Sequence, residues 1–151
     1  EVVREGIQDV RGSLNRLRPG ALEGRTLKDA LEKMIREYQT LSNLQVDLHY
    51  EWVDVDMDVM IEDTIFRVIQ ESMTNAVRHG HASQMSLHFF ENEEDYLIEL
   101  QDNGVGFETL TYGYGLKQMM ERISILGGQL QFESRDGFFT RISLPKYKEG
   151  R

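Results

Sequence analysis

The stretch YLIELQDNGVGF, residues 96–107, ends an apolar alternation with a carboxylate. In a β-strand, side chains alternate between two faces, so Tyr96, Ile98, Leu100 and Asp102 share one face. The first three belong in a core, and a buried carboxylate without a partner costs several kcal/mol. We therefore expect Asp102 to accept a hydrogen bond from a buried donor, such as the exocyclic amine of a ligand.

The residues after Asp102 allow two interpretations. Asn103-Gly104 could form a tight hairpin turn, which is common for this dipeptide. However, the next segment does not have the pattern of a strand that pairs back. Gly104 and Gly106 would instead let the backbone approach a ligand closely.

A second group of polar residues lies in IFRVIQESMTNAVRHG, residues 65–80. Glu71 and Asn75 are four residues apart and share a helix face, and Arg78 and His79 follow one turn later. Taken alone, this is most often a solvated helix face. A carboxylate beside an amide oxygen also suits a Mg²⁺ ion and a general base.

Two glycines, Gly113 and Gly115, precede a predicted helix that begins at Leu116. Backbone N–H groups at a helix N-terminus favour bound anions such as phosphate. A Gly-x-Gly before a helix is a weak signal by itself.

Thr140 heads the apolar row of FFTRISLP, which continues with Ile142 and Leu144. A satisfied strand threonine is the ordinary interpretation. Because Asp102 and Thr140 both end apolar strand faces, together they indicate a pocket at one end of the core.

Periodicity predicts the elements that would position these residues. Val3, Ile7, Val10, Leu14 and Leu17 form an a/d seam in a first helix. Further helices are expected over residues 26–43, 58–79 and 116–126, and strands over 45–53, 85–90, 96–101, 129–134 and 138–145. The order predicts an α/β two-layer sandwich with one mixed sheet covered by helices on one face.

Composition narrows the function classes. The 151 residues include 26 Asp and Glu against 17 Lys and Arg, for a formal net charge of −9, which argues against nucleic acid as a partner. Cysteine is absent, which excludes disulfides and thiol chemistry. The sequence contains neither an apolar run long enough to span a bilayer nor a signal-peptide pattern. It begins without Met, so we read it as a fragment.

The ordered motifs over residues 58–145 resemble the Bergerat ATP-binding fold of gyrase-type ATPases, Hsp90, MutL and histidine kinases (the GHKL fold). QESMTNAVRHGHAS, DNGVGF and GYGLKQMMERI look like the catalytic domain of sensor histidine kinases that are paired with LuxR-type response regulators. Residues 1–19 look like the end of the second helix of that subfamily's dimerisation and phosphoacceptor domain. Residues 20–148 would then be the catalytic ATP-binding domain.

The resemblance implies roles for the candidate residues, with ATP and Mg²⁺ as cofactors. Glu71 would be the catalytic acid. Glu71 and Asn75 together would form the metal site, and Asp102 would bind adenine. The other nucleotide-binding positions implied are Arg78, His79, Gly104, Gly106, Gly113, Gly115, Leu116 and, through water, Thr140. Residues 107–114 would form a short ATP lid. Gln118 departs from the family, which usually has a small residue there.

The resemblance also implies partners: the chain's own dimerisation domain, a LuxR-type response regulator and a second copy in a homodimer. We expect the cytoplasmic domain of a membrane-bound sensor kinase. The family's phosphoacceptor histidine is followed by an acidic residue, and this is true of none of the four histidines: His49, His79, His81 and His88. We therefore expect the fragment to bind Mg-ATP without phosphorylating itself.

Two other functions share the ATP site. An anti-sigma-factor serine kinase would have the same motifs, although the seam helix that ends in LRP speaks against it. A nucleotide-sensing module without catalysis would have no need of Glu71.

Overall fold

A computed structural model describes residue 22, residues 24–107 and residues 115–146. The seam helix, Gly113 and most of the predicted lid therefore lie outside the described residues. The elements follow the predicted order: α2 (Leu27–Leu41), β1 (Gln45–Tyr50), α3 (Val59–Arg78), β2 (Gln84–Glu91), β3 (Asp95–Asp102), α4 (Leu116–Ile125), β4 (Gln129–Ser134) and β5 (Phe138–Pro145).

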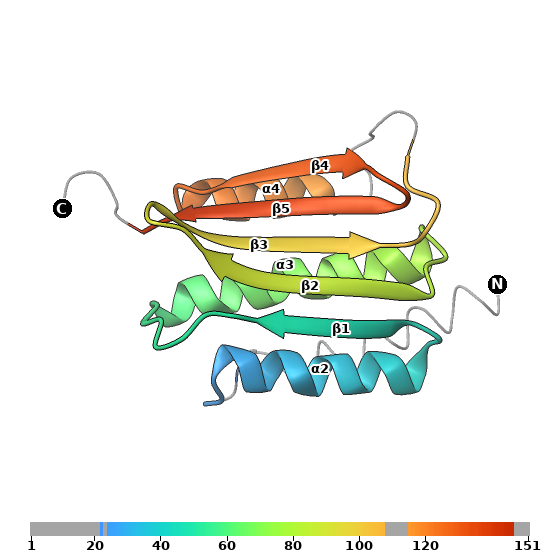
Figure 1. The fold of residues 1–151 in the computed structure, drawn as a ribbon, viewed down its shortest axis with the longest axis horizontal. Helices are drawn as coiled ribbons and strands as arrows, with labels where there is room; N and C mark the ends of the chain where they lie inside the picture. The colour runs from blue at the N-terminus through green and yellow to red at the C-terminus, as the bar shows by residue number, and fades with distance from the viewer. Residues whose placement is uncertain (1–21, 23, 108–114, 147–151) are drawn as a thin grey trace.

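The five strands form one mixed sheet in the order β1-β2-β3-β5-β4. β1 and β2 are parallel, and α3 is the crossover helix that a parallel connection requires. The other neighbours are antiparallel. Figure 1 shows α3 and α4 behind the sheet, and α2 beside β1 at the sheet's edge. The predicted two-layer α/β sandwich, with helices on one face, is confirmed.

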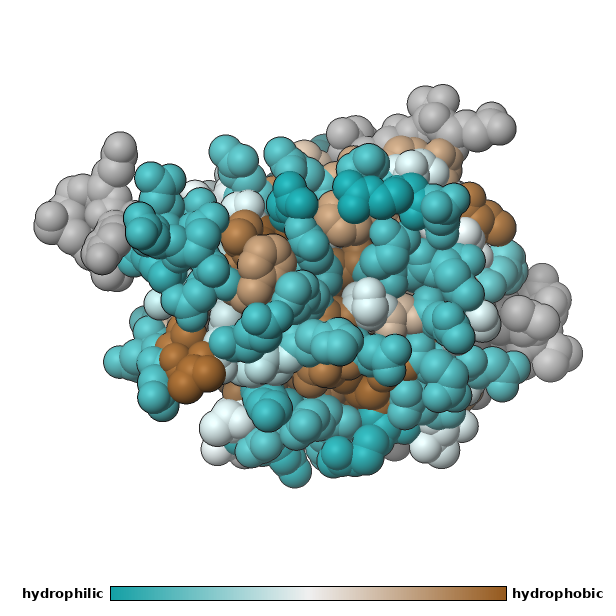
Figure 2. Space-filling view, in the orientation of Figure 1, coloured by the Kyte–Doolittle hydropathy of each residue, from teal (hydrophilic) through white to brown (hydrophobic). Residues whose placement is uncertain are grey.

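The core lies between the sheet and the helices. The apolar stripe of α3, with Ile65, Ile69 and Met73, is fully buried. It faces strand positions such as Ile98 and Ile142, which are also fully buried and are register partners on β3 and β5. The opposite face of the sheet is mostly hydrophilic in Figure 2. Strand alternation has therefore sorted the side chains as the sequence predicts.

Local signals fix the helix ends. The Thr26 hydroxyl accepts a hydrogen bond from the backbone N–H of Asp29 (3.1 Å) and caps α2. The Asp58 carboxylate accepts from the N–H of Met60 (2.7 Å) and caps α3. Both contacts satisfy donors that a helix leaves unpaired in its first turn.

The first strand is shorter than predicted, because β1 ends at Tyr50. Trp52 is nevertheless buried, with 5 % of its surface exposed. Its ring packs edge-to-face on Phe89 (4.9 Å between centroids), and its Nε1–H donates to the carbonyl of Phe90 (2.6 Å). Trp52 thus points inward as expected, but from the connection to α3.

Candidate functional site

Asp102 is the last residue of β3 and is 5 % exposed. Its Oδ1 accepts hydrogen bonds from the backbone N–H groups of Gly104 (2.8 Å) and Phe138 (3.0 Å). These bonds offset part of the cost of burying the carboxylate. Oδ2 accepts no hydrogen bond from any residue that the structure describes. Asp102 is therefore a fixed acceptor with one oxygen left for a ligand.

Gly104 brings the loop after β3 against the end of α3. A Cβ on Gly104 would lie 2.4 Å from the carbonyl oxygen of Gly80, too close for any other residue. The N–H of Val105 donates to the same carbonyl (3.0 Å). This contact joins the Asp102 loop to the end of the helix that carries Glu71 and Asn75, and the close approach of Gly104 to a ligand stays a prediction.

Gly106 makes a similar contact with the β4–β5 turn. It has a φ of +65°, and a Cβ there would lie 2.5 Å from the hydroxyl of Ser134. The same hydroxyl accepts from the N–H of Phe107 (3.1 Å), whose ring packs on Phe138 (5.1 Å between centroids). The turn between β4 and β5 therefore holds the start of the predicted lid.

Asn103 fastens the loop on its other side. Its Oδ1 accepts from the backbone N–H groups of Ser83 and Gln84 (both 2.9 Å), and its Nδ2 donates to the Ser83 hydroxyl (3.0 Å). Its own N–H donates to the carbonyl of Gln84 (3.1 Å). These four bonds fix the position of the backbone next to Asp102.

Glu71 lies beside the N-terminus of α4. Gly115 is the N-cap of that helix, with a left-handed φ of 79°. A Cβ on Gly115 would lie 2.8 Å from the carboxyl carbon of Glu71. Leu116 follows as the first helical residue and is buried. The structure therefore brings Glu71 and Gly115 together, as the sequence-based site requires.

Asn75, Arg78 and His79 lie on the last turns of α3 and are half-buried. The N–H groups of His79 and Gly80 both donate to the carbonyl of Asn75 (2.9 and 3.0 Å), which closes the helix. Asn75 is one turn along the helix from Glu71, so the two oxygens share a face. The polar end of α3 is thus next to the Gly104 loop.

Thr140 is 3 % exposed and lies on β5 opposite Leu100. The register therefore places Thr140 diagonal to Asp102 on the helix-covered face, where side chains lie within about 8 Å of each other. The expected pair of polar groups at the ends of two apolar rows is present.

The side chains at the site also decide which metal ion could bind there. No group of three or more His, Asp or Glu side chains that could hold a metal ion is found within the described ranges. Mg²⁺ at nucleotide sites is usually held by one or two protein oxygens together with substrate phosphates and water. Glu71 and Asn75 fit that smaller requirement.

None of the described helices is long and apolar enough to cross a membrane.

Sequence reasoning missed the contribution of the β4–β5 turn to the site. Phe138 acts on Asp102 through its backbone N–H, which no residue type reveals. Gly137 lies so close to Asp102 that a Cβ would be 2.0 Å from the Asp102 carbonyl oxygen. Asp136 and Gly137 are residue types that favour a turn, but the pairing of β3 with β5, which brings this turn to Asp102, cannot be read from the sequence.

The chain is similar to known proteins in sequence and in fold. The family described as histidine kinase-, DNA gyrase B-, and HSP90-like ATPase matches residues 60–148. The signal transduction histidine-protein kinase/phosphatase UhpB of Salmonella typhimurium is 35 % identical over 147 residues, covering 93 % of this chain and 29 % of that protein. The sensor histidine kinase LiaS of Bacillus subtilis is 31 % identical over 143 residues, covering 93 % and 39 %. The chain thus spans less than half the length of these relatives.

Solved structures share the fold. The Acinetobacter baumannii histidine kinase AdeS superposes with a TM-score of 0.70 at 19 % identity, covering 97 % of this chain and 76 % of that one. The ATP binding domain of PrrB from Mycobacterium tuberculosis gives 0.65 at 20 % identity, covering 80 % and 93 %.

Proposed function

The chain belongs to the family of histidine kinase-, DNA gyrase B- and HSP90-like ATPases, and we propose that it is the ATP-binding catalytic domain of a two-component sensor histidine kinase. The observation that carries the proposal is the geometry of Asp102. Its Oδ1 is held by two backbone amides, and its Oδ2 accepts from no described residue. An exocyclic amine, as in adenine, is a donor that matches this oxygen.

The other residues then have distinct tasks. Thr140 supports the adenine contact through a water molecule. Glu71 activates the attacking group, and Asn75 with Glu71 holds Mg²⁺, which supplies positive charge against the phosphates. The phosphate groups are bound by Arg78, His79 and Gly113, and by the N-terminus of α4 at Gly115 and Leu116. Positioning and charge stabilisation supply most of the rate in such a phosphoryl transfer.

The phosphoryl acceptor is a histidine outside this chain. In the intact protein, we propose that residues 1–19 continue from a dimerisation and phosphoacceptor domain, and that residues 20–148 bind ATP. The phosphoryl group would pass to that histidine and then to a LuxR-type response regulator. The intact kinase would be a homodimer whose catalytic domain lies in the cytoplasm.

Calorimetric titration with ATP tests the nucleotide site. Wild type should bind with micromolar to millimolar affinity, on the order of −4 to −8 kcal/mol. Asp102→Asn should weaken ATP binding at least about tenfold, and Asn75→Ala should remove mainly the Mg²⁺ dependence. Asp95→Asn, at the opposite end of the same strand, is the matched control and should bind normally. Equal binding by Asp102→Asn and wild type would refute the adenine assignment.

Radiolabelled ATP tests the kinase chemistry. Phosphohistidine survives base, so label that stays on the isolated chain after denaturation in base would contradict the assignment of the acceptor to another domain. Label should appear on an added phosphoacceptor domain and be lost in acid. Acid-stable label on a serine of an added partner would instead support the serine-kinase alternative.

A further inference from the structure

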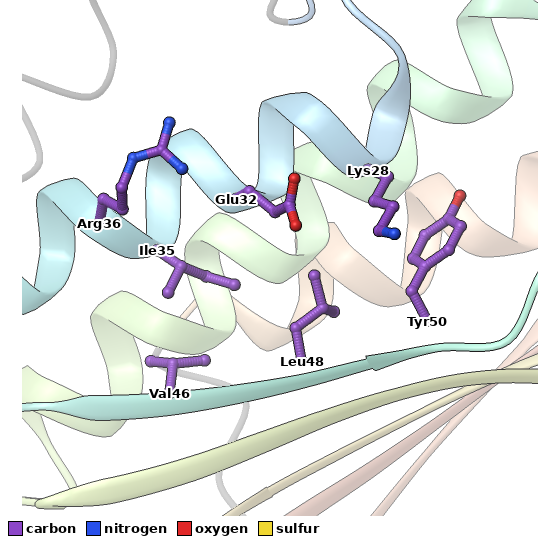
Figure 3. A pocket seen from close by; sticks show the side chains of 7 residues that line it. All are labelled: Lys28, Glu32, Ile35, Arg36, Val46, Leu48 and Tyr50. Carbon is purple, nitrogen blue, oxygen red and sulfur yellow. The ribbon is translucent and has the colours of Figure 1, made fainter.

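A groove of about 350 Å³ lies between α2 and β1, away from Asp102. Figure 3 shows side chains from α2 on one side and from β1 on the other. Its apolar part consists of Ile35, Val46 and Leu48, of which Ile35 and Val46 are buried. The remaining lining residues are Lys28, Glu32, Arg36 and Tyr50.

The groove runs along the outer edge of the sheet, because β1 is an edge strand. The N–H of Gln45 donates to the carbonyl of Ser83, just before β2, and the N–H of Glu51 donates to the carbonyl of Phe89 on β2. Because N–H groups alternate in direction along a strand, those of Val46, Leu48 and Tyr50 point away from β2. The N–H of Val46, the first of these, donates to Oε1 of Gln39 (2.9 Å). Within the described part of the chain, no acceptor meets the N–H of Leu48 or Tyr50.

Charged side chains line the helix side of the groove. Lys28, Glu32 and Arg36 follow one another at four-residue spacing on α2. None of the three forms an ion pair with a described residue. Two cations and one anion line the groove, and the Glu62 carboxylate, whose charge acts on Tyr50, lies near the Tyr50 end. Lys28 and Arg36 therefore offer two cations, eight residues apart on α2, to the carboxylates of an occupant.

We propose that this groove binds an extended, acidic segment of a partner protein, which adds to the outer edge of β1 as a further strand. Backbone groups of the segment would pair with those of Leu48 and Tyr50. An aliphatic side chain would pack on Ile35 and Leu48, and two carboxylates would meet Lys28 and Arg36.

The spacing of the two cations sets the pattern of the segment. Eight helical residues span about 12 Å, and four strand residues span about 13 Å. Carboxylates four residues apart, with an aliphatic residue midway, therefore share one face of the segment and match the groove. Adenine binding is not required, so the inference does not depend on the proposed function.

A second copy of this chain fits the groove less well. Pairing of two β1 edges would bring two copies of Lys28 and Arg36 together, and like charges repel. The face of β1 that lines the groove offers only Val46, Leu48 and Tyr50, with no carboxylate. A segment of another protein is therefore the better occupant.

The probe is the blocked heptapeptide acetyl-TETLTET-amide, titrated into the isotope-labelled chain and followed by NMR. The amides of Leu48 and Tyr50 should shift in a saturable way and exchange more slowly with solvent. Lys28→Glu combined with Arg36→Glu should weaken binding about tenfold, because two attractions become repulsions. Lys33→Glu combined with Lys117→Glu makes the same charge change outside the groove and should bind like wild type.

A second comparison does not depend on a variant protein. Acetyl-TQTLTQT-amide keeps the length and the aliphatic residue but lacks the carboxylates, and it should bind about tenfold more weakly than the acidic peptide. Three results would overturn the proposal: no saturable shift at Leu48 and Tyr50, equal affinity for the two peptides, or self-association of the chain through these amides in the absence of peptide.

Discussion

The backbone N–H of Phe138, at the start of β5, donates to Oδ1 of Asp102, at the end of β3, over 3.0 Å. A hairpin turn that is distant in the sequence therefore orients the carboxylate. The second donor, the N–H of Gly104, comes from the loop after Asp102 itself. The acceptor is thus fixed from two directions before any ligand arrives, which lowers the ordering cost of binding.

Substitutions of Asp102 should separate its structural and ligand-binding tasks. Asp102→Ala leaves the N–H groups of Gly104 and Phe138 without an acceptor and should lower the free energy of unfolding by about 1–3 kcal/mol. Asp102→Asn keeps a carbonyl oxygen for those donors, so it should cost clearly less. Urea denaturation measures both values. If alanine and asparagine were equally destabilising, Oδ1 would not have the anchoring task that the distances indicate.

Gly137→Ala should disturb Asp102 directly. Gly137 has a φ of +133°, and a Cβ would lie 2.0 Å from the Asp102 carbonyl oxygen. Backbone strain and overpacking together should cost about 2–5 kcal/mol. Gly127→Ala is the control, because Gly127 also has a positive φ (+79°) but its nearest neighbour would be 3.9 Å away.

The control should cost only the left-handed penalty of about 1–2 kcal/mol. Thermal denaturation of the two variants gives the comparison. Similar losses in both would mean that the close approach to Asp102 adds nothing to the cost of the left-handed backbone.

Asn103 should act as a positioning residue for Asp102. Asn103→Ala removes the acceptor for Ser83 and Gln84 and should reduce both stability, by about 0.5–1.5 kcal/mol, and ATP affinity. Asn103→Asp keeps the acceptor oxygen and loses only the bond to the Ser83 hydroxyl, so it should restore most of the affinity. Calorimetry with ATP checks this, and an alanine variant with unchanged affinity would show that the clamp supports the fold alone.

Much of this site could be predicted from residue types and spacing. Alternation along residues 96–102 placed Asp102 inside, and Thr140 was expected at the end of its own apolar row. Both are buried, since a strand's two-residue period leaves no other choice once one face packs on helices. The spacing of Glu71 and Asn75 likewise fixed their shared helix face.

The contacts between segments were not accessible in the same way. The contact of Gly104 with Gly80 was not expected, because residues 80 and 104 lie on separate segments. The bond from Phe138 to Asp102 depends on β3 pairing with β5, and no local pattern specifies that register. The groove beside β1 also required the position of α2, because its lining residues come from two separate elements.

Alkaline pH should unfold the chain partly through Tyr50. Burial, and then the charge of Glu62, raises the pKa of Tyr50 from 10.0 to about 12. The folded state thus holds the phenol proton more tightly than the unfolded state, so its stabilising effect is complete below pH 10.0 and is lost as the pH rises to about 12. Denaturation midpoints across this range, for wild type and Tyr50→Phe, should show a larger loss in wild type than in the variant.

Glu62→Gln should lower the pKa of Tyr50, because it removes the second cause of the shift. Tyrosinate absorbance, taken as the difference from Tyr50→Phe, measures that pKa. Glu121→Gln on α4 is the control, and it should leave the titration unchanged. An unchanged titration in Glu62→Gln as well would show that burial alone raises the pKa of Tyr50.

The most direct test of the site is a nucleotide swap at Asp102. Adenine offers an amine where inosine carries a carbonyl, so wild type should bind ATP at least about tenfold more tightly than inosine triphosphate. In Asp102→Asn, the amide keeps its oxygen on Gly104 and Phe138 and turns its Nδ2 donor toward the base. The preference should then shrink or reverse in competition binding. An undiminished preference for ATP in Asp102→Asn would contradict the assignment of Asp102 to the adenine amine.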